Sequence, residues 1–462
     1  MLDHDVAWYL VATRNWLEGA RLYVDIIEVN PPLNFYLTVP AILIADATGF
    51  GDQNAQYISF SILLFISLFW CWKIRENVEG ITTGQRILFQ LFIALAVVMP
   101  ALGALTQRDH IFTVFLLPWL IGFLPSSKKP PIRSQIARAA FAGLGICLKP
   151  HFLIFPISVF LWQCWLKRSL RPLREPWLLA QGIIGLTYVS YVFFVHPEYF
   201  SDTIPLGALV YGSYGFSDRA VLAPIFSMPA KFVFISLLLA LLSRNRPPSL
   251  GLFVVLTVAG LGTYLSQWKG YPYQLIPFYS VSILGLGWLV VAVPGWSPSR
   301  IAAVTTLFMI CAVKLLLGPY HNAGTVLLGD RVRGQSSVTA LTTDLFVGPA
   351  VAFYAGAEWS SRYPALWLVP GVVNNIDGTD CAVEVERCET LGHIAERTRR
   401  DFVSDLKTFK PEAIIVDNQP MYIIDKNFDW WTFMEPNPEF AKIMGNYRLE
   451  QSMERFDIWV LR

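Results

Sequence analysis

Charged residues are scarce in this 462-residue chain, where Asp, Glu, Lys and Arg make up only 15% of the sequence. A soluble domain of ordinary composition is about 25% charged. Hydrophobic residues reach 54%, and the mean hydropathy is +0.46. These values exclude an ordinary soluble protein and predict an integral membrane protein. The formal net charge of +2 identifies no partner, and we expect no nucleic-acid partner.

Cysteine is also scarce, and its spacing excludes the common zinc motifs. The chain has six cysteines and no Cys-x-x-Cys pair. Cys381 and Cys388 lie in the polar sequence CAVEVERC, and we expect a disulfide between them in an oxidising compartment. The other four lie in or beside apolar runs, where we expect them to pack as small hydrophobic side chains: Cys71, Cys147, Cys164 and Cys311. The start of the chain lacks the basic and apolar regions of a cleavable signal.

Long apolar runs occupy most of the chain up to residue 318. About twenty apolar residues cross a bilayer, and shorter runs can cross with help from neighbouring helices. The broken segment 31–48 contains prolines and could span, re-enter or lie along the interface. We expect spans at 56–73, 86–105, 110–125, 137–149, 151–166, 176–196, 230–243, 250–267, 272–293 and 299–318.

Basic residues are concentrated in alternate connections between these spans. Such residues favour the cytoplasmic side. The expected cytoplasmic connections include SSKKPPIRSQIAR at 126–138, LKRSLRPLREP at 166–176 and SRNRPP at 243–248. The other connections and everything after about residue 319 then face outward. The C-terminal part is therefore expected outside the membrane, which is the periplasm if the membrane is a bacterial inner membrane.

The first 55 residues fall on the outward side, although no apolar helix precedes them. This predicts a further membrane helix upstream of residue 1; the alternative is insertion of the chain by its first helical hairpin. One-sided helical spacing within this segment predicts a helix that either lies on the outer leaflet or packs in a core. Its apolar stripe comprises Val6, Tyr9, Leu10, Thr13 and Leu17.

The C-terminal part is richer in charge and predicts a small α/β domain. We expect a helix at HIAERTRRDFVSDLKTF, residues 393–409. We expect strands at AVAFYA (350–355), PALWLVP (364–370), EAIIVD (412–417) and FDIWVLR (456–462). The predicted fold is an α-helical polytopic membrane protein of about 10–11 spans with a small extracytoplasmic α/β domain. The predicted division is 1–319 for the membrane domain, with 1–55 as its first external loop, and 320–462 for the external domain.

Ionisable residues gather at the outward ends of the expected spans. Such groups are costly at membrane depth, so their clustering suggests a functional site. Carboxylates can take the proton of an acceptor hydroxyl, and cations can stabilise a departing phosphate. No nucleotide-sugar pool exists on the outer side, so an activated donor there would be carried on a lipid. The outward set comprises Asp3, His4, Asp5, Glu28, Arg108, Asp109, His110, Lys149, His151 and Lys269.

The sequence DHDVAWYLVATRNWLEGARLYVDIIEVNPPLNFYL, residues 3–37, resembles the first external loop of a known enzyme group. That group is the polyprenyl-phosphate-sugar glycosyltransferases with the GT-C fold, which include glycosyltransferase family 39, the protein O-mannosyltransferases and the aminoarabinose transferases. QRDHIF (107–112), GICLKPH (145–151) and QWKGYPYQLIP (267–277) resemble later motifs of the group, in the same order. The resemblance covers most of residues 1–320.

The resemblance implies a role for each candidate residue. Asp5 or Asp3 would be the general base, and Asp109 would position the acceptor or a metal. Substrate and phosphate binding would involve Glu28, Arg108, Lys149, Lys269 and Tyr273. The implied donor is a polyprenyl-phosphate-sugar, and the acceptor a glycan, lipid or protein. No cofactor is firmly implied, although the resemblance leaves room for a divalent metal.

Each of these residues also has a structural alternative. Asp3 or Asp5 could cap the helix near Val6, and Asp109 could pair with Arg108. The basic residues could extend to the interface. The scattered histidines predict no metal site. Arg362 either reaches the membrane site or stabilises the fold.

The chain departs from the group at Glu28. The aminoarabinose transferase has Glu-Lys-Pro-Pro where this chain has Glu-Val-Asn-Pro-Pro. The lysine is absent and the spacing is one residue longer, which weakens the substrate role of Glu28. The favoured interpretation is an inverting transferase of single sugars. The alternatives are a lipid-linked polysaccharide polymerase or ligase, a membrane transporter, or a non-catalytic assembly protein.

Overall fold

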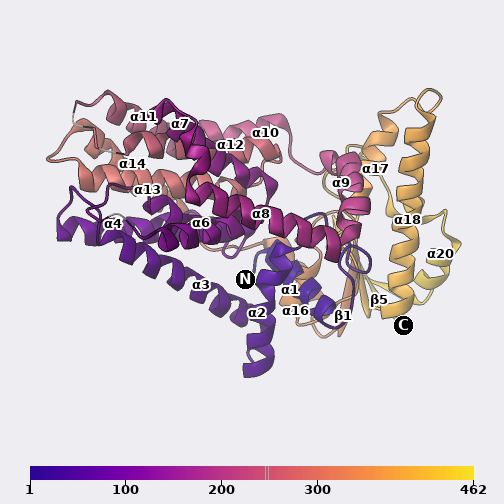
Figure 1. Ribbon diagram of the computed structural model, residues 1–462. Helices are drawn as coiled ribbons and strands as arrows, with labels where there is room; N and C mark the ends of the chain where they lie inside the picture. Colours follow the sequence, from indigo (N-terminus) through magenta and orange to yellow (C-terminus); the bar gives the residue numbers. More distant parts are fainter. Residues whose placement is uncertain (129, 245, 248) are drawn as a thin grey trace. The chain divides into compact units, whose positions relative to one another are not determined.

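The structure is a computed structural model that describes residues 1–128, 130–244, 246–247 and 249–462. Its internal contacts divide the chain into two compact units, which we describe separately (Figure 1). The membrane unit comprises residues 43–192 and 216–320. The α/β unit comprises residues 1–42, 193–215 and 321–462. The predicted functional division at residue 319/320 stays a prediction.

The membrane unit is helical, and a helix overlaps each of the ten expected spans, although α4 ends at Val98, short of the expected end at residue 105. Its long helices are α3 (Asp52–Arg75), α4 (Thr83–Val98), α5 (Arg108–Ile121), α6 (Ile132–Ile146), α7 (Ile154–Lys167), α8 (Pro176–Val195), α11 (Met228–Leu242), α12 (Leu250–Gln267), α13 (Ile276–Ala292) and α14 (Pro298–Leu317). Short helices are η1 (Pro150–Leu153), η2 (Arg171–Arg174), α10 (Asp218–Leu222), η5 (Ala223–Phe226) and η6 (Pro272–Leu275). In the described chain, five helical segments are long and apolar enough to cross a membrane, or six if the bent pair Asp218–Phe226 and Met228–Leu242 is one span.

Helix α13 forms the centre of this unit because it is apolar on every side. Its residues from Ile276 to Val291 are all buried, and it packs against α4 and α12. A helix that is hydrophobic all round requires such complete burial. Gly287 allows a close approach, since a Cβ atom there would lie 2.5 Å from Cβ of Phe92.

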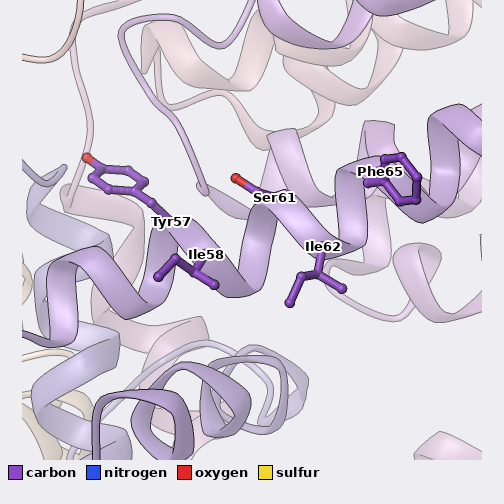
Figure 2. Close-up of a pocket in the computed structure, with 5 residues that line it drawn as sticks. All are labelled: Tyr57, Ile58, Ser61, Ile62 and Phe65. Carbon is purple, nitrogen blue, oxygen red and sulfur yellow. The ribbon is translucent and has the colours of Figure 1, made fainter. Parts of the chain in front are cut away.

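Helix α3 shows the opposite pattern, with much of its apolar surface exposed. A shallow groove runs along it, lined by Tyr57, Ile58, Ser61, Ile62 and Phe65 (Figure 2). An exposed apolar surface on a helix of this length is what contact with lipid chains requires. The groove therefore fits a lipid-facing surface, and its lining residues include no acidic or basic side chain.

The α/β unit contains a five-stranded sheet in the order β2-β1-β3-β5-β4. Its strands are β1 (Ser337–Leu341), β2 (Glu358–Trp359), β3 (Ala413–Asp417), β4 (Tyr447–Ser452) and β5 (Phe456–Leu461). Strand β1 is parallel to both β2 and β3, whereas β5 is antiparallel to β3 and β4. The carboxyl ends of β1 and β3 therefore meet at one edge of the sheet.

The helices of the α/β unit come from both ends of the chain and from the middle segment 193–215 (Figure 1). They are α1 (His4–Leu17), α2 (Leu33–Thr48, which continues into the membrane unit), α9 (Ile204–Val210), α15 (Ala323–Arg331), α16 (Pro349–Ala355), α17 (Leu368–Asp377), α18 (Val385–Phe409), α19 (Trp430–Met434) and α20 (Pro438–Met444), with the short helices η3 (Tyr199–Thr203) and η4 (Tyr211–Ser213). Helix α1 contacts α16, and Trp8, Tyr9 and Ala12 share one core with sheet residues such as Val338 and Ile415.

The predicted apolar stripe of α1 is thus packed core. Val6, Tyr9, Leu10 and Thr13 are buried, whereas Leu17 at the end of the helix is 47% exposed. Burial of this face against a sheet accounts for the one-sided spacing in the sequence.

The C-terminal secondary structure was predicted only in part. The predicted strands at 412–417 and 456–462 are β3 and β5, and the predicted helix lies within α18. The predicted strand AVAFYA is instead helix α16, which begins at Pro349 and ends before Gly356, whose φ is +75°. Proline in the first turn and glycine after the last turn favour a helix. PALWLVP is likewise no strand, since its second half begins α17.

The predicted cysteine pair lies at the start of α18. Cys381 and Cys388 form a disulfide with their Cα atoms 5.7 Å apart. The other four cysteines are free. The disulfide closes the short polar connection between α17 and α18.

Candidate active site

Five of the predicted site residues gather in two groups, one in each unit: Asp3 and Asp5 in the first, and Asp109, Lys149 and Tyr273 in the second. The first, which we call the acidic group, comprises Asp3, His4 and Asp5 at the start of α1. Asp3 is the N-cap, and its carboxylate accepts a hydrogen bond of 3.0 Å from the backbone N–H of Asp5. Nε2 of His4 lies 3.7 Å from Oδ1 of Asp5. The structural role weighed for Asp3 is therefore present, and Asp5 is not the cap.

The acidic group also has a donor set that fits a divalent cation. Each of its three residues offers one ligand atom, and these atoms lie within 4.8 Å of one another. Two carboxylates and an imidazole suit a first-row divalent ion, and carboxylate oxygens also suit Mg²⁺. Asp3, His4 and Asp5 would hold such an ion.

A second set of charges lies at the sheet edge where β1 and β3 end. Arg455 donates from Nε to Oδ1 of Asp417 at 2.8 Å and from Nη2 to Oδ2 at 2.9 Å, and it also pairs with Asp344. Thr342 donates from its hydroxyl to Asp417 at 3.0 Å. Burial raises the pKa of Asp344 to about 7, against the opposing influence of Arg455. Ligands commonly bind outside the carboxyl ends of parallel strands.

His4 links the acidic group electrostatically to this sheet edge. Burial alone would lower the pKa of His4, but the carboxylates of Asp3, Asp5 and Asp344 together raise it. Without a bound metal the imidazole is therefore a cation over a wider pH range than usual, and a divalent ion that binds His4 would displace this proton.

Tyr214 provides an aromatic wall beside the same edge. Its hydroxyl donates to the carbonyl of Thr343 at 2.8 Å, and its ring centroid lies 4.2 Å from that of Tyr422. Burial, with Tyr422, Asp344 and Asp5 as further causes, raises the pKa of Tyr214 well above its usual value. The phenol stays neutral, so the site combines carboxylates, an imidazole and a neutral aromatic surface.

Glu28 serves the local fold of the N-terminal segment. Nε1 of Trp8 donates to its Oε2 at 2.6 Å, while the backbone N–H and the side-chain amide of Asn30 donate to its Oε1 at 2.8 and 2.5 Å. Both carboxylate oxygens thus hold α1 to the segment that precedes α2. A substrate role for Glu28 stays a prediction.

Arg362 also stabilises the α/β unit. Its guanidinium lies 2.9 Å from Asp405 and 3.6 Å from Asp401. Its carbonyl accepts a hydrogen bond of 2.9 Å from Ile27. These contacts match the structural alternative weighed for this residue.

The second group, which we call the cationic group, lies in the membrane unit around Lys149. Its Nζ atom lies 2.5 Å from Oδ2 of Asp109 and 3.0 Å from Oε1 of Gln267. Gln267 also accepts a hydrogen bond of 3.0 Å from Gln274. The lysine and the aspartate are both buried, and Nζ lies 5.1 Å from the ring centroid of Tyr273. Three predicted residues, from three separate parts of the sequence, therefore converge here.

Lys269 lies in the connection between α12 and η6. The backbone on either side is left-handed, with φ of 47° at Trp268 and 79° at Gly270. The Trp268 indole donates to Asp218 at 2.8 Å, which holds this turn in place. Burial lowers the pKa of Lys269 to about 8.

Arg108 and His110 begin helix α5 on either side of Asp109. Arg108 is the first helical residue and is buried. The imidazole of His110 accepts a hydrogen bond of 3.2 Å from the backbone N–H of Thr106, and its ring packs on Phe60 at 4.6 Å. His110 is thus used in packing, as is consistent with leaving it out of the predicted site.

Several site neighbours were missed by the sequence analysis. Gln267 and Gln274 lie in the quoted motif QWKGYPYQLIP, but as neutral amides they carry no charge and were assigned no role. The pair Asp344 and Asp417 had a signal, since Asp417 ends the predicted strand EAIIVD. Strand β1 was not predicted, so its position beside β3 and the proximity of Asp344 could not be inferred.

Comparisons with known proteins bear on the fold. Searches of protein-family models and of curated protein sequences each returned no match. The structure matches ArnT from Cupriavidus metallidurans bound to undecaprenyl phosphate, with a TM-score of 0.56 and 11% identity over 99% of this chain and 94% of that chain. The apo state of that protein gives a TM-score of 0.52 and 12% identity over 98% and 92% of the two chains. The arabinofuranosyltransferase AftD from Mycobacteria gives 0.45 and 12% identity, and the match spans 39% of its length.

The matches to ArnT extend over nearly the whole of both chains, so they include the helices of the membrane unit and the sheet of the α/β unit. They confirm the predicted fold class. This protein is an integral, helical polytopic membrane protein with a C-terminal mixed α/β region, and it has the GT-C fold of ArnT.

Proposed function

We propose that this protein transfers a single sugar from a polyprenyl-phosphate-sugar donor to an acceptor hydroxyl, with inversion at the anomeric carbon. The observation that carries the proposal is the match, over 99% of the chain, to ArnT in complex with undecaprenyl phosphate. Because one fold can host several functions, the proposal also depends on the chemistry of the two residue groups.

Asp5 is the favoured general base. Asp3 is tied to the start of the helix by the hydrogen bond from the N–H of Asp5, whereas Asp5 is not the cap and lies beside the imidazole of His4. The acceptor hydroxyl would give its proton to this carboxylate while its oxygen attacks the anomeric carbon. The bond from that carbon to the phosphate oxygen breaks, both electrons stay with the oxygen, and polyprenyl phosphate leaves.

The cationic group suits the phosphate of the donor. Arg108, Lys149 and Lys269 would neutralise the charge that grows on the phosphate as it leaves, and Tyr273 would pack against the donor. Arginine offers paired donors to a phosphate, whereas lysine acts as a point charge. Asp109 would orient Lys149, with which it forms a buried ion pair.

A divalent ion would add a further positive charge to the acidic group. Bound there, it would polarise an oxygen of the donor or the acceptor.

We propose that the site faces the periplasm of a bacterial inner membrane, that residues 1–319 carry the transfer, and that residues 320–462 orient the acceptor.

The direct test is sugar transfer in membranes that contain the full-length protein. A panel of synthetic polyprenyl-phosphate-linked pentoses and hexoses would be supplied, with nucleotide-sugars as the control donors. We expect transfer from a lipid-linked donor and none from nucleotide-sugars. Transfer of an assembled glycan alone would instead support a polymerase or ligase. An inserted, monodisperse protein that uses no donor would contradict the proposal.

A further inference from the structure

A cavity of about 390 Å³ lies at the ends of α3, α5 and α6 in the membrane unit, among residues assigned no role above. Its walls combine apolar side chains, such as Trp70, Ile74 and Leu124, with basic ones. The basic residues are Lys73, Lys128 and Arg138. The cavity is therefore amphipathic and positively charged.

Arg138 is the notable member because its charge is buried. The residue is only 5% exposed. Its Nε donates to the carbonyl of Ser134 at 3.1 Å. Within the described chain, no carboxylate lies within ion-pair distance of its guanidinium. A buried charge without a counter-charge is costly, so this guanidinium suits an anion that the chain itself does not supply.

The fold leaves space for this guanidinium at Gly122, the C-cap of α5. A Cβ atom at Gly122 would lie 2.4 Å from Nη1 and 2.9 Å from Cζ of Arg138. The carbonyls at the end of α5 place a partial negative charge nearby, equivalent to about half an electron charge. That dipole offsets only part of a full positive charge.

The rim of the cavity is held by backbone hydrogen bonds. The N–H of Glu79 donates to Pro125 at 2.9 Å, and the N–H of Ser127 donates to Asn77 at 2.9 Å. At the opening, Lys73 lies 3.8 Å from Glu76 in an exposed ion pair. Exposed pairs of this kind are weak, so the cavity keeps a net positive charge.

The location favours a lipid over a soluble anion. The cavity lies between helices of the membrane unit, beside the basic connection 126–138 that the charge distribution assigns to the cytoplasmic side. Anionic phospholipids attract basic groups at this surface, and basic pockets between membrane helices bind their head groups. The apolar wall formed by Trp70, Ile74 and Leu124 matches the glycerol and upper acyl regions of a phospholipid.

We propose that this cavity binds the head group of an anionic phospholipid, with its phosphate at Arg138 and Lys128. The bound lipid supplies the counter-charge that the described residues lack, and it joins the ends of α3, α5 and α6. This site is separate from sugar transfer and does not depend on the proposed enzyme activity.

The test uses the full-length protein purified in an uncharged detergent. Bound phosphatidylglycerol and phosphatidylcholine with identical acyl chains are counted by native mass spectrometry over a concentration series. A third arm asks whether inorganic phosphate displaces the lipid. We expect phosphatidylglycerol to be preferred, and its affinity to fall roughly tenfold or more in Arg138→Gln, because a hydrogen-bonded charge pair is lost.

Arg133→Gln is the matched control. Arg133 lies on the same helix and is exposed, and it is not part of the cavity wall. Its substitution removes the same charge and should leave phosphatidylglycerol affinity within about twofold. Gly122→Ala is the second variant, since it retains every charge but moves the guanidinium. Gly122→Ala should also weaken the binding of phosphatidylglycerol. If Arg138→Gln does not fold, this variant alone tests whether the Arg138 guanidinium binds the lipid.

Four outcomes would overturn the proposal. The first is equal binding of the two lipids, and the second is an equal loss in the Arg133 and Arg138 variants. The third is displacement of phosphatidylglycerol by inorganic phosphate at equal concentration, which would identify a free anion as the ligand. If Gly122→Ala binds phosphatidylglycerol as tightly as the wild-type protein does, Arg138 only caps α5.

Discussion

The Nζ atom of Lys149 lies 2.5 Å from Oδ2 of Asp109, and both side chains are buried in the membrane unit. Removal of one partner from such a pair leaves an uncompensated charge and costs about 3–5 kcal/mol. We expect Lys149→Met to lower the free energy of unfolding by about that amount. The double variant Lys149→Met/Asp109→Leu should recover most of it, because both charges are then gone. The free energy of unfolding of the single and the double variant is measured in mild detergent.

The double variant of this pair distinguishes an effect on stability from an effect on sugar transfer. If Lys149 contacts the donor phosphate, the double variant should be folded but should lose sugar transfer. Transfer by the stable double variant at the wild-type rate would remove both residues from the proposed mechanism.

The two aspartates at the start of α1 should differ in their effects. We expect Asp5→Asn to lower kcat by about 10²–10⁴-fold, as loss of a general base does. Asparagine caps a helix about as well as aspartate, so Asp3→Asn should retain the fold. It should also retain most of the activity measured without added divalent ions. The initial rate of transfer from the preferred donor measures both. A larger loss in Asp3→Asn than in Asp5→Asn would reassign the base.

The pKa of about 8 at Lys269 gives an expected pH profile. The amine is protonated below this pKa and binds phosphate; above it the charge is lost. We therefore expect kcat/KM to fall as the pH rises through about 8. In Lys269→Arg the guanidinium stays charged, so this alkaline limb should disappear. An unchanged limb in the arginine variant would assign the titration to another group.

Glu28 is expected to act through the fold. Glu28→Gln keeps an acceptor for the Trp8 indole, so we expect transfer activity within several-fold of wild type. Glu28→Ala leaves buried donors on Trp8 and Asn30 unpaired, which costs about 1–3 kcal/mol each. Thermal unfolding and transfer should be measured together. A stable glutamine variant that has lost transfer would show that the charge of Glu28 contacts substrate.

The fold class could be predicted from the sequence because membrane helices have a strong signal. Apolar runs such as 250–267 coincide with helices, and the fold resemblance needed only motifs in the right order. Strand β1 is hard to predict because SVTAL is short and its polar–apolar alternation covers only Ser337 to Ala340. AVAFYA resembles a strand in composition, but the proline before it and the glycine after it favour a helix. For such short segments the local composition does not distinguish a strand from a helix, and the flanking residues determine which one forms.

The candidate site was predicted less completely. Lys149, Asp109 and Tyr273 converge as the order of the motifs suggested. By contrast, the place of Asp344 and Arg455 beside the acidic group depends on strand pairing between distant segments, as in β1 with β3. A single sequence carries no direct record of such pairing.

Helix α1 shares its core with strands that are synthesised much later, since Trp8 and Tyr9 pack with Val338 and Ile415. Helix α1 therefore has no complete native core until those strands have been made. At 5–20 residues per second, that interval lasts for tens of seconds. During this time, the apolar face of α1 needs a chaperone, the membrane surface or another temporary cover. Truncation at the C-terminus should consequently harm the N-terminal segment first, and protease sensitivity near residue 20 should report whether biogenesis is complete.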